Sequence, residues 1–149
     1  MEHFQDKVAV ITGAASGIGQ ALAERCLQEG MKVMLADVEA EALTATAETF
    51  RSGYNNPIET QVVDVSIVEQ LSALRDATVE AYGGVHLLFN NAGVGGSGGA
   101  WTGTEKDWAW VIGVNLLSVV HGLRLFVPIM LEQNEPGHIV NTASVAGLM

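Results

Sequence analysis

A short apolar segment runs directly into a glycine-rich turn near the start of the chain. Residues 8–11 (VAVI) lead into residues 12–19 (TGAASGIG), and an amphipathic segment, 20–29, follows at once. This order predicts a strand, a tight turn and a helix. Glycine lets the backbone reverse and come close to a ligand, and a helix N-terminus offers free N–H donors to phosphate. The segment therefore predicts a dinucleotide phosphate site.

The spacing of the glycines narrows the type of phosphate site. Gly13, Gly17 and Gly19 form G-x-x-x-G-x-G, whereas the commoner dinucleotide pattern is G-x-G-x-x-G, and no Lys-Ser/Thr pair follows as a P-loop requires. The predicted cofactor-binding residues of this turn are Gly13, Ala15, Ser16, Gly17, Ile18 and Gly19.

Strand and helix patterns alternate along the whole chain. Strands are expected at 7–12, 32–36, 58–63, 86–90 and 138–142, and helices at 18–29, 39–52, 67–82 and 105–133. Continuous apolar runs between helices are typical of parallel strands buried on both faces. Gly30, Gly53 and Gly83 are expected to end the first three helices, and Thr104 with Asp107 forms a capping box before the last. We therefore expect an α/β fold: a doubly wound, Rossmann-like parallel sheet of five strands with helices on both faces.

Length and charge exclude several classes of protein. The 149 residues correspond to one domain, the apolar fraction of 48% predicts a folded chain, and the net charge of −10 disfavours nucleic acid and anionic membranes. A single cysteine, Cys26, cannot form an internal disulfide and is expected to pack in the first helix. We see no apolar leader and no run of membrane-spanning length, so a cytoplasmic location is expected.

An acidic residue, Asp37, ends the second predicted strand, 18 residues after Gly19. Its carboxylate could accept hydrogen bonds from the hydroxyls of an adenosine ribose, and it would repel a 2′-phosphate. Alternatively, Asp37 caps the helix that begins near Glu39. No arginine lies beside Asp37 or in the glycine turn, so NAD is favoured over NADP.

Four further motifs follow in order along the chain. They are Asp64-Val65, Asn90-Asn91-Ala92-Gly93, Asn115 and Ser144, the last just after the apolar segment 138–141. Together with TGAASGIG, they resemble the short-chain dehydrogenase/reductase family over essentially the whole chain, as its N-terminal, cofactor-binding portion. The resemblance implies an oxidoreductase that transfers hydride between NAD(H) and a small alcohol or carbonyl substrate, and that forms a homodimer or homotetramer.

The resemblance also implies a role for each motif. Asp64 would bind the exocyclic amine of adenine and the Val65 N–H a ring nitrogen, although Asp64 could also cap the helix near Ile67, and both roles could hold together. The motif Asn90-Asn91-Ala92-Gly93 would supply cofactor contacts through Asn91, Ala92 and Gly93. The catalytic residues would be Ser144, which hydrogen-bonds the substrate oxygen, and Asn115, which helps to hold a water chain to a catalytic lysine.

The chain departs from the family pattern at its proton-transfer motif. Neither Tyr54 nor Tyr82 has a lysine four positions later; Ile58 and His86 stand there. We therefore expect residues 1–149 to form a Rossmann domain that is incomplete at its C-terminus and inactive alone, with Tyr-x-x-x-Lys beyond Met149. The alternative is a non-catalytic dinucleotide-binding or regulatory half-domain. The codons that follow Met149 discriminate between the two.

The histidines and the last helix complete the sequence predictions. His86 stands where the family usually has an acid, and we expect it to be structural or solvated. The other histidines lack metal-ligand spacing, so no metal site is expected. In segment 115–130, one side carries Leu116, Val119, Val120 and Leu123, and the other carries Leu117, Leu125, Val127 and Ile129. One side can cover the sheet, and the excess predicts a second buried face, within the complete fold or against a partner chain.

Overall fold

The computed structural model describes residues 3–96, 99 and 101–145, in which strands and helices alternate. The elements are β1 (Val8–Thr12), α1 (Gly17–Gln28), β2 (Lys32–Asp37), α2 (Ala40–Gly53), β3 (Ile58–Val62), α3 (Val68–Tyr82), β4 (Leu87–Asn90), α4 (Glu105–Ile112), the π-helix η1 (Gly113–Leu117), α5 (Ser118–Glu132) and β5 (His138–Asn141).

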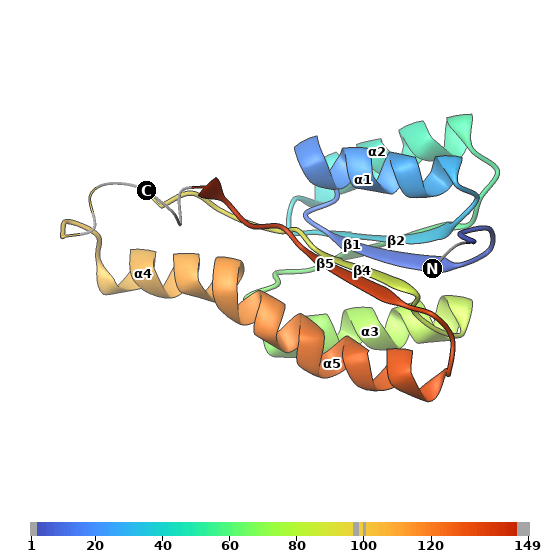
Figure 1. Ribbon diagram of the computed structural model, residues 1–149. Coiled ribbons are helices and arrows are strands. Elements are labelled where there is room, and N and C mark those ends of the chain that lie inside the picture. Colours follow the sequence, from blue (N-terminus) through green and yellow to red (C-terminus); the bar gives the residue numbers. More distant parts are fainter. Residues whose placement is uncertain (1–2, 97–98, 100, 146–149) are drawn as a thin grey trace.

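The strands form one parallel sheet in the order β3-β2-β1-β4-β5. Helices α1 and α2 cover one face, and α3 and α5 cover the other (Figure 1). The chain therefore winds outward from β1 in one direction and then returns to place β4 on the other side of β1. This topology confirms the predicted doubly wound fold, and it puts a switch point at the carboxyl ends of β1 and β4, where open α/β sheets bind ligands.

Alternate side chains of the central strands fill two separate cores. On β1, Ala9 and Ile11 belong to the cluster that includes α1 and α2, whereas Val10 belongs to the cluster that includes α3 and α5. This alternation follows from the two-residue period of a strand. Cys26 is buried in the first cluster as predicted, and burial raises the pKa of its thiol to about 11.

Two of the three predicted glycine stops have the expected left-handed conformation. Gly30 follows α1 with φ +79°, and Gly83 is the C-cap of α3 with φ +82°. The prediction for Gly53 is wrong, because Gly53 is still the last residue of α2 and Tyr54, in an extended conformation, ends the helix.

The outermost strands are less buried than the sequence analysis assumed. Strand β3 pairs only with β2, and most of its residues lie exposed or half-buried. Its sequence, IETQV, has three polar residues in the middle, which fits this exposure, whereas a continuous apolar run was expected. Strand β5 is the opposite edge within the described residues, and it pairs with β4 from Leu87↔His138 to Asn90↔Asn141.

The predicted helix 105–133 is interrupted rather than regular. It starts at the predicted capping box, in which the Thr104 hydroxyl accepts from the Asp107 N–H and the Asp107 carboxylate accepts from the Thr104 N–H. The π-helix η1 then separates α4 from α5. The segment Glu105–Glu132 is long and apolar enough to cross a membrane by length and composition, which corrects the expectation that no run has that length. In this fold, α5 instead packs against α3 and the sheet (Figure 1).

Small residues take much of the face that α5 turns to the sheet. The buried positions of α5 are Ser118, Gly122, Phe126 and Met130. A Cβ atom on Gly122 would lie 2.4 Å from the side-chain oxygen of Asn90, so a larger residue would displace that buried side chain, which donates to Asn141. Neither of the two apolar sides predicted from sequence is this buried stripe. Leu116, Leu117 and Val120 lie exposed instead.

Candidate functional site

The turn between β1 and α1 has the backbone geometry that its glycines predict. Gly13 has φ +67° and Gly17 has φ +54°, a region that other residues rarely adopt. A Cβ atom on Gly13 would lie 2.9 Å from the Ala92 Cα, and one on Gly19 would lie 1.9 Å from the Gly13 carbonyl oxygen. The turn is thus closed tightly against the segment after β4, whereas the space beside Gly17 is open.

The first turn of α1 leaves its amide groups available to a ligand. Ser16 is the N-cap, in an extended conformation, and its hydroxyl makes no capping hydrogen bond within the described chain. The first N–H groups of a helix lack partners inside the helix, and they carry the positive end of its dipole. The geometry at residues 16–19 therefore fits a bound diphosphate.

Asp37 connects the end of β2 to the glycine turn. One of its carboxylate oxygens accepts from the Ala15 N–H at 2.9 Å, and the other accepts from the Glu39 N–H at 3.1 Å. The N-cap of α2 is Glu39, so Asp37 is not the helix cap that the alternative interpretation placed there. A carboxylate has about four acceptor positions. Asp37 therefore retains acceptor capacity toward the cavity beside it.

The segment after β3 holds Asp64 in a local turn. The Asp64 carboxylate accepts from the Ser66 N–H at 2.9 Å and from the Ser66 hydroxyl at 2.6 Å. Helix α3 begins at Val68 with Ile67 as its N-cap, so Asp64 does not cap it. The side-chain oxygen of Gln70 accepts from the Asp64 N–H at 2.8 Å. Gln70 therefore orients this turn, a role that the sequence analysis missed because it depends on the local fold.

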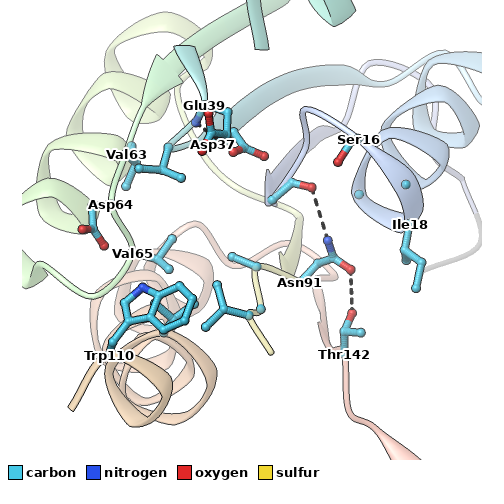
Figure 2. Close-up of a pocket in the computed structure, with 18 residues that line it drawn as sticks. Ser16, Ile18, Asp37, Glu39, Val63, Asp64, Val65, Asn91, Trp110 and Thr142 are labelled. Atoms are coloured by element: carbon cyan, nitrogen blue, oxygen red, sulfur yellow. Dashed lines mark hydrogen bonds between the residues drawn. The ribbon is translucent and has the colours of Figure 1, made fainter. Parts of the chain in front are cut away.

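The segment after β4 is tied to both neighbouring strands. The Thr12 hydroxyl accepts from the N–H groups of Asn91 at 3.0 Å and Ala92 at 3.1 Å, and the Asn91 amide donates to the Thr12 carbonyl at 3.1 Å. On its other side, the Asn91 oxygen accepts from the Thr142 hydroxyl at 2.9 Å, as Figure 2 shows. Asn91 thus joins β1, β4 and the chain beyond β5 at the switch point.

The two residues assigned to catalysis lie outside the wall of the cavity. Asn115, in η1, pairs with the backbone of Val94: its oxygen accepts from the N–H and its amide donates to the carbonyl, both at 2.8 Å. Its side chain therefore fixes the segment after β4. Ser144 lies exposed, three residues beyond the end of β5.

A single cavity collects most of the predicted cofactor residues. It measures about 500 Å³ and lies at the carboxyl ends of the strands. Of the predicted residues, it is lined by Gly13, Ser16, Gly17, Ile18, Gly19, Asp37, Asp64, Val65, Asn91, Ala92 and Gly93. The cavity is also lined by residues that were not predicted from the sequence: Val38, Glu39, Val63, Val94, Trp110, Val114 and Thr142. Ala15 is not part of the wall, and its N–H faces Asp37 instead. Asp37 and Glu39 lie together at one end, next to the glycine turn, and Asp64 and Val65 lie across the cavity from Ser16 and Ile18 (Figure 2).

His86 has a structural role at the opposite, amino end of the sheet. One ring nitrogen accepts from the Val8 N–H at 3.2 Å, and the other lies 3.0 Å from a carboxylate oxygen of Glu135, which also pairs with Lys7. Lys7 and His86 hold the pKa of Glu135 below its usual range. Across residues 3–96, 99 and 101–145, no three His, Cys, Asp or Glu side chains gather as metal ligands.

A parallel sheet with a glycine turn at its switch point defines a dinucleotide-binding α/β protein. The chain belongs to the short-chain dehydrogenase family, whose sequence model matches residues 7–149. It is 35% identical over 151 residues to a CLA biosynthesis dehydrogenase/reductase of Lactiplantibacillus plantarum, covering 100% of this chain and 52% of that protein. It is 40% identical over 151 residues to a C alpha-dehydrogenase of Sphingobium sp., covering 100% of this chain and 49% of that protein.

Solved structures agree with this assignment. A short chain dehydrogenase/reductase from Burkholderia phymatum in complex with NAD superposes with a TM-score of 0.96 and 56% sequence identity, covering 100% of this chain and 53% of that one. Levodione reductase superposes with a TM-score of 0.91 and 39% identity, covering 99% of this chain and 57% of that one. The chain therefore spans about half the length of the relatives that it matches.

Proposed function

We propose that this chain is the NAD-binding part of a short-chain dehydrogenase or reductase that interconverts a small alcohol and its carbonyl compound. The observation that carries the proposal is the continuous path from the glycine turn to Asp37. Gly13 and Gly19 let the turn close against itself and against Asn91 and Ala92, and the Asp37 carboxylate at the end of β2 accepts from the Ala15 N–H of the same turn, so that the turn and Asp37 border one cavity. This is the arrangement that binds a diphosphate and then a ribose.

The charges around the cavity favour NAD over NADP. Asp37 and Glu39 are both part of the wall, and no lysine or arginine of the described residues lines it. A 2′-phosphate would meet two carboxylates and no cation, which is unfavourable. The relative from Burkholderia phymatum, which is 56% identical, was solved in complex with NAD, and this supports the same choice here.

The proposed chemistry divides between the cofactor and this chain. Bound NAD would supply a hydride acceptor at its nicotinamide ring. Ser144 would hydrogen-bond the substrate oxygen at the carboxyl edge of the sheet, and Asn115 would hold the segment after β4 in position. A pure binding module does not need Ser144, so its presence favours an oxidoreductase over the half-domain alternative. Residues 1–149 contain no Tyr-x-x-x-Lys, and we propose that they bind NAD without turning over an alcohol.

Replacing Asp37 tests the proposed cofactor choice. Asp37→Ala is expected to weaken NAD binding by about 1.5–3 kcal/mol, because a charged acceptor for the ribose hydroxyls is lost. The same change should reduce the discrimination against NADP. Calorimetric titration of both cofactors measures the two effects, with Asp76→Ala, an exposed aspartate on α3, as the matched control. Equal affinity of the unmutated protein for NAD and NADP would contradict the proposal.

We also propose that the protein is a homo-oligomer, that it is cytoplasmic, and that it has neither a nucleic acid nor a membrane as a partner. The outer side of η1 and α5 exposes Leu116 (58%), Leu117 (43%) and Val120 (40%) on neighbouring turns. A contiguous apolar surface of this kind is uncommon on a soluble monomer. A two-fold contact between identical helices is a common way to bury such a surface.

A charge placed on this apolar surface is expected to dissociate the oligomer. Leu116→Glu would bury an unpaired carboxylate in the contact, so the mass measured by light scattering after size exclusion should fall to that of a monomer. Val62→Glu is the control, because Val62 is similarly exposed (54%) but lies on β3 at the far edge of the sheet. A monodisperse monomer for the unmutated protein would refute the proposed association.

A further inference from the structure

A tryptophan on α4 reaches the cavity from outside the sheet. Trp110 lies on the short helix α4, in which no residue is buried, and its side chain is 49% exposed. It nevertheless lines the cavity together with Val65 and Val114. Figure 2 shows the indole beside Val65 and on the same side of the cavity as Asp64, across from Ser16 and Ile18.

The placement of Trp110 is specific to its position on the helix. Trp110 and Val114 are four residues apart and so lie on one helical side, which is the side that borders the cavity. Trp108 sits on the same helix with nearly the same exposure, 47%, but it is not part of the cavity wall. Its indole lies near Gly103 instead. A tryptophan on α4 can therefore be half exposed without lying at the cavity, as Trp108 is.

The surroundings of Trp110 fit one part of a dinucleotide. The proposed phosphate contacts lie at the glycine turn and the proposed ribose contact at Asp37, so the base would lie between Val63, Asp64 and Val65. These residues offer an apolar surface and a carboxylate, but no aromatic plane. An indole face is a surface on which a purine can stack.

We infer that Trp110 forms an aromatic wall of the base site, against which the purine of the bound dinucleotide packs. This inference rests on the proposed function, because it requires that the cavity bind an adenine dinucleotide. It adds a contact from α4, an element outside the β-α turns that hold the phosphates and the ribose. The wall would hold purine nucleotides more tightly than the valines and Asp64 do alone.

Calorimetric titration of NAD and of AMP tests the inference. AMP carries the base without the nicotinamide, so a base contact must affect both ligands equally. Trp110→Ala is expected to weaken both by about tenfold, and Trp110→Phe, which keeps an aromatic face, should recover most of the loss. Trp108→Ala is the matched control and should leave both affinities unchanged. Thermal unfolding of each variant checks that α4 and the sheet remain folded, which is expected because Trp110 is half exposed.

Each other outcome has a distinct meaning. If NAD binds Trp110→Ala as tightly as it binds the unmutated protein, the inference is overturned and the proposed function stands. A loss in Trp108→Ala as large as that in Trp110→Ala also overturns the inference, because the effect then belongs to the helix as a whole. If the unmutated protein binds neither NAD nor AMP, the proposed function fails, and the inference fails with it.

Discussion

Gly19→Ala is expected to abolish NAD binding and to lower the free energy of unfolding by about 3 kcal/mol or more. This loss is larger than that caused by most substitutions that overpack a core. The added Cβ would lie 1.9 Å from the Gly13 carbonyl oxygen and 2.8 Å from the Asn91 side-chain nitrogen. Because the first of these is a backbone atom, α1 must move away from the turn that it closes. The phosphate cradle is lost with that movement. Urea unfolding measures the loss of stability, and calorimetry measures the loss of binding.

A second glycine provides the control for this substitution. Gly53, at the end of α2, has open space around it and no left-handed backbone, so Gly53→Ala should be neutral or stabilise by about 0.5–1 kcal/mol. A Gly19→Ala variant that retained the affinity and stability of the unmutated protein would show that α1 does not pack on the glycine turn as described.

Phe126→Ala is expected to cost about 3–5 kcal/mol of unfolding free energy. Phe126 is 1% exposed and is the largest fully buried side chain of the described residues, in the core between the sheet, α3 and α5. Its removal leaves a cavity in the layer that holds α5 against β4. Urea unfolding of this variant should be compared with that of Leu131→Ala, whose side chain on the same helix is 73% exposed. The Leu131→Ala variant should stay within about 0.5 kcal/mol of the unmutated protein. Equal costs for the two variants would contradict the described packing of α5.

Local sequence patterns predict most of this fold because they act within a few residues. The apolar run 8–11 and the glycines after it specify β1, the turn and α1 without help from the rest of the chain. The order of strands and helices then leaves few topologies, since crossovers in parallel sheets are right-handed. The same reasoning predicts where Asp37, Asp64 and Asn91 lie, because each follows a strand whose carboxyl end meets the others at one edge.

Residues defined by distant contacts could not be predicted in this way. Gly122 lies between His121 and Leu123 in the sequence, and only the nearness of the Asn90 side chain on β4 shows why a small residue fits this buried position. Hydrophobic periodicity therefore pointed to Leu116 and Val120, which lie exposed. Trp110 and Thr142 reach the cavity from α4 and from beyond β5, and no local pattern links either residue to the glycine turn.

The π-helix η1 sets the rotational phase of the two helices that it joins. An α-helix has 3.6 residues per turn, so positions four apart drift around the axis by about 40° at each step. The wider turn at Gly113–Leu117 takes back part of that drift. Trp110, Val114, Ser118 and Gly122, spaced four apart, can therefore stay on one side of the combined helix, where the first two line the cavity and the last two are buried against the sheet. The wide turn thus lets one helical side continue from the cavity wall to the buried layer beneath the sheet.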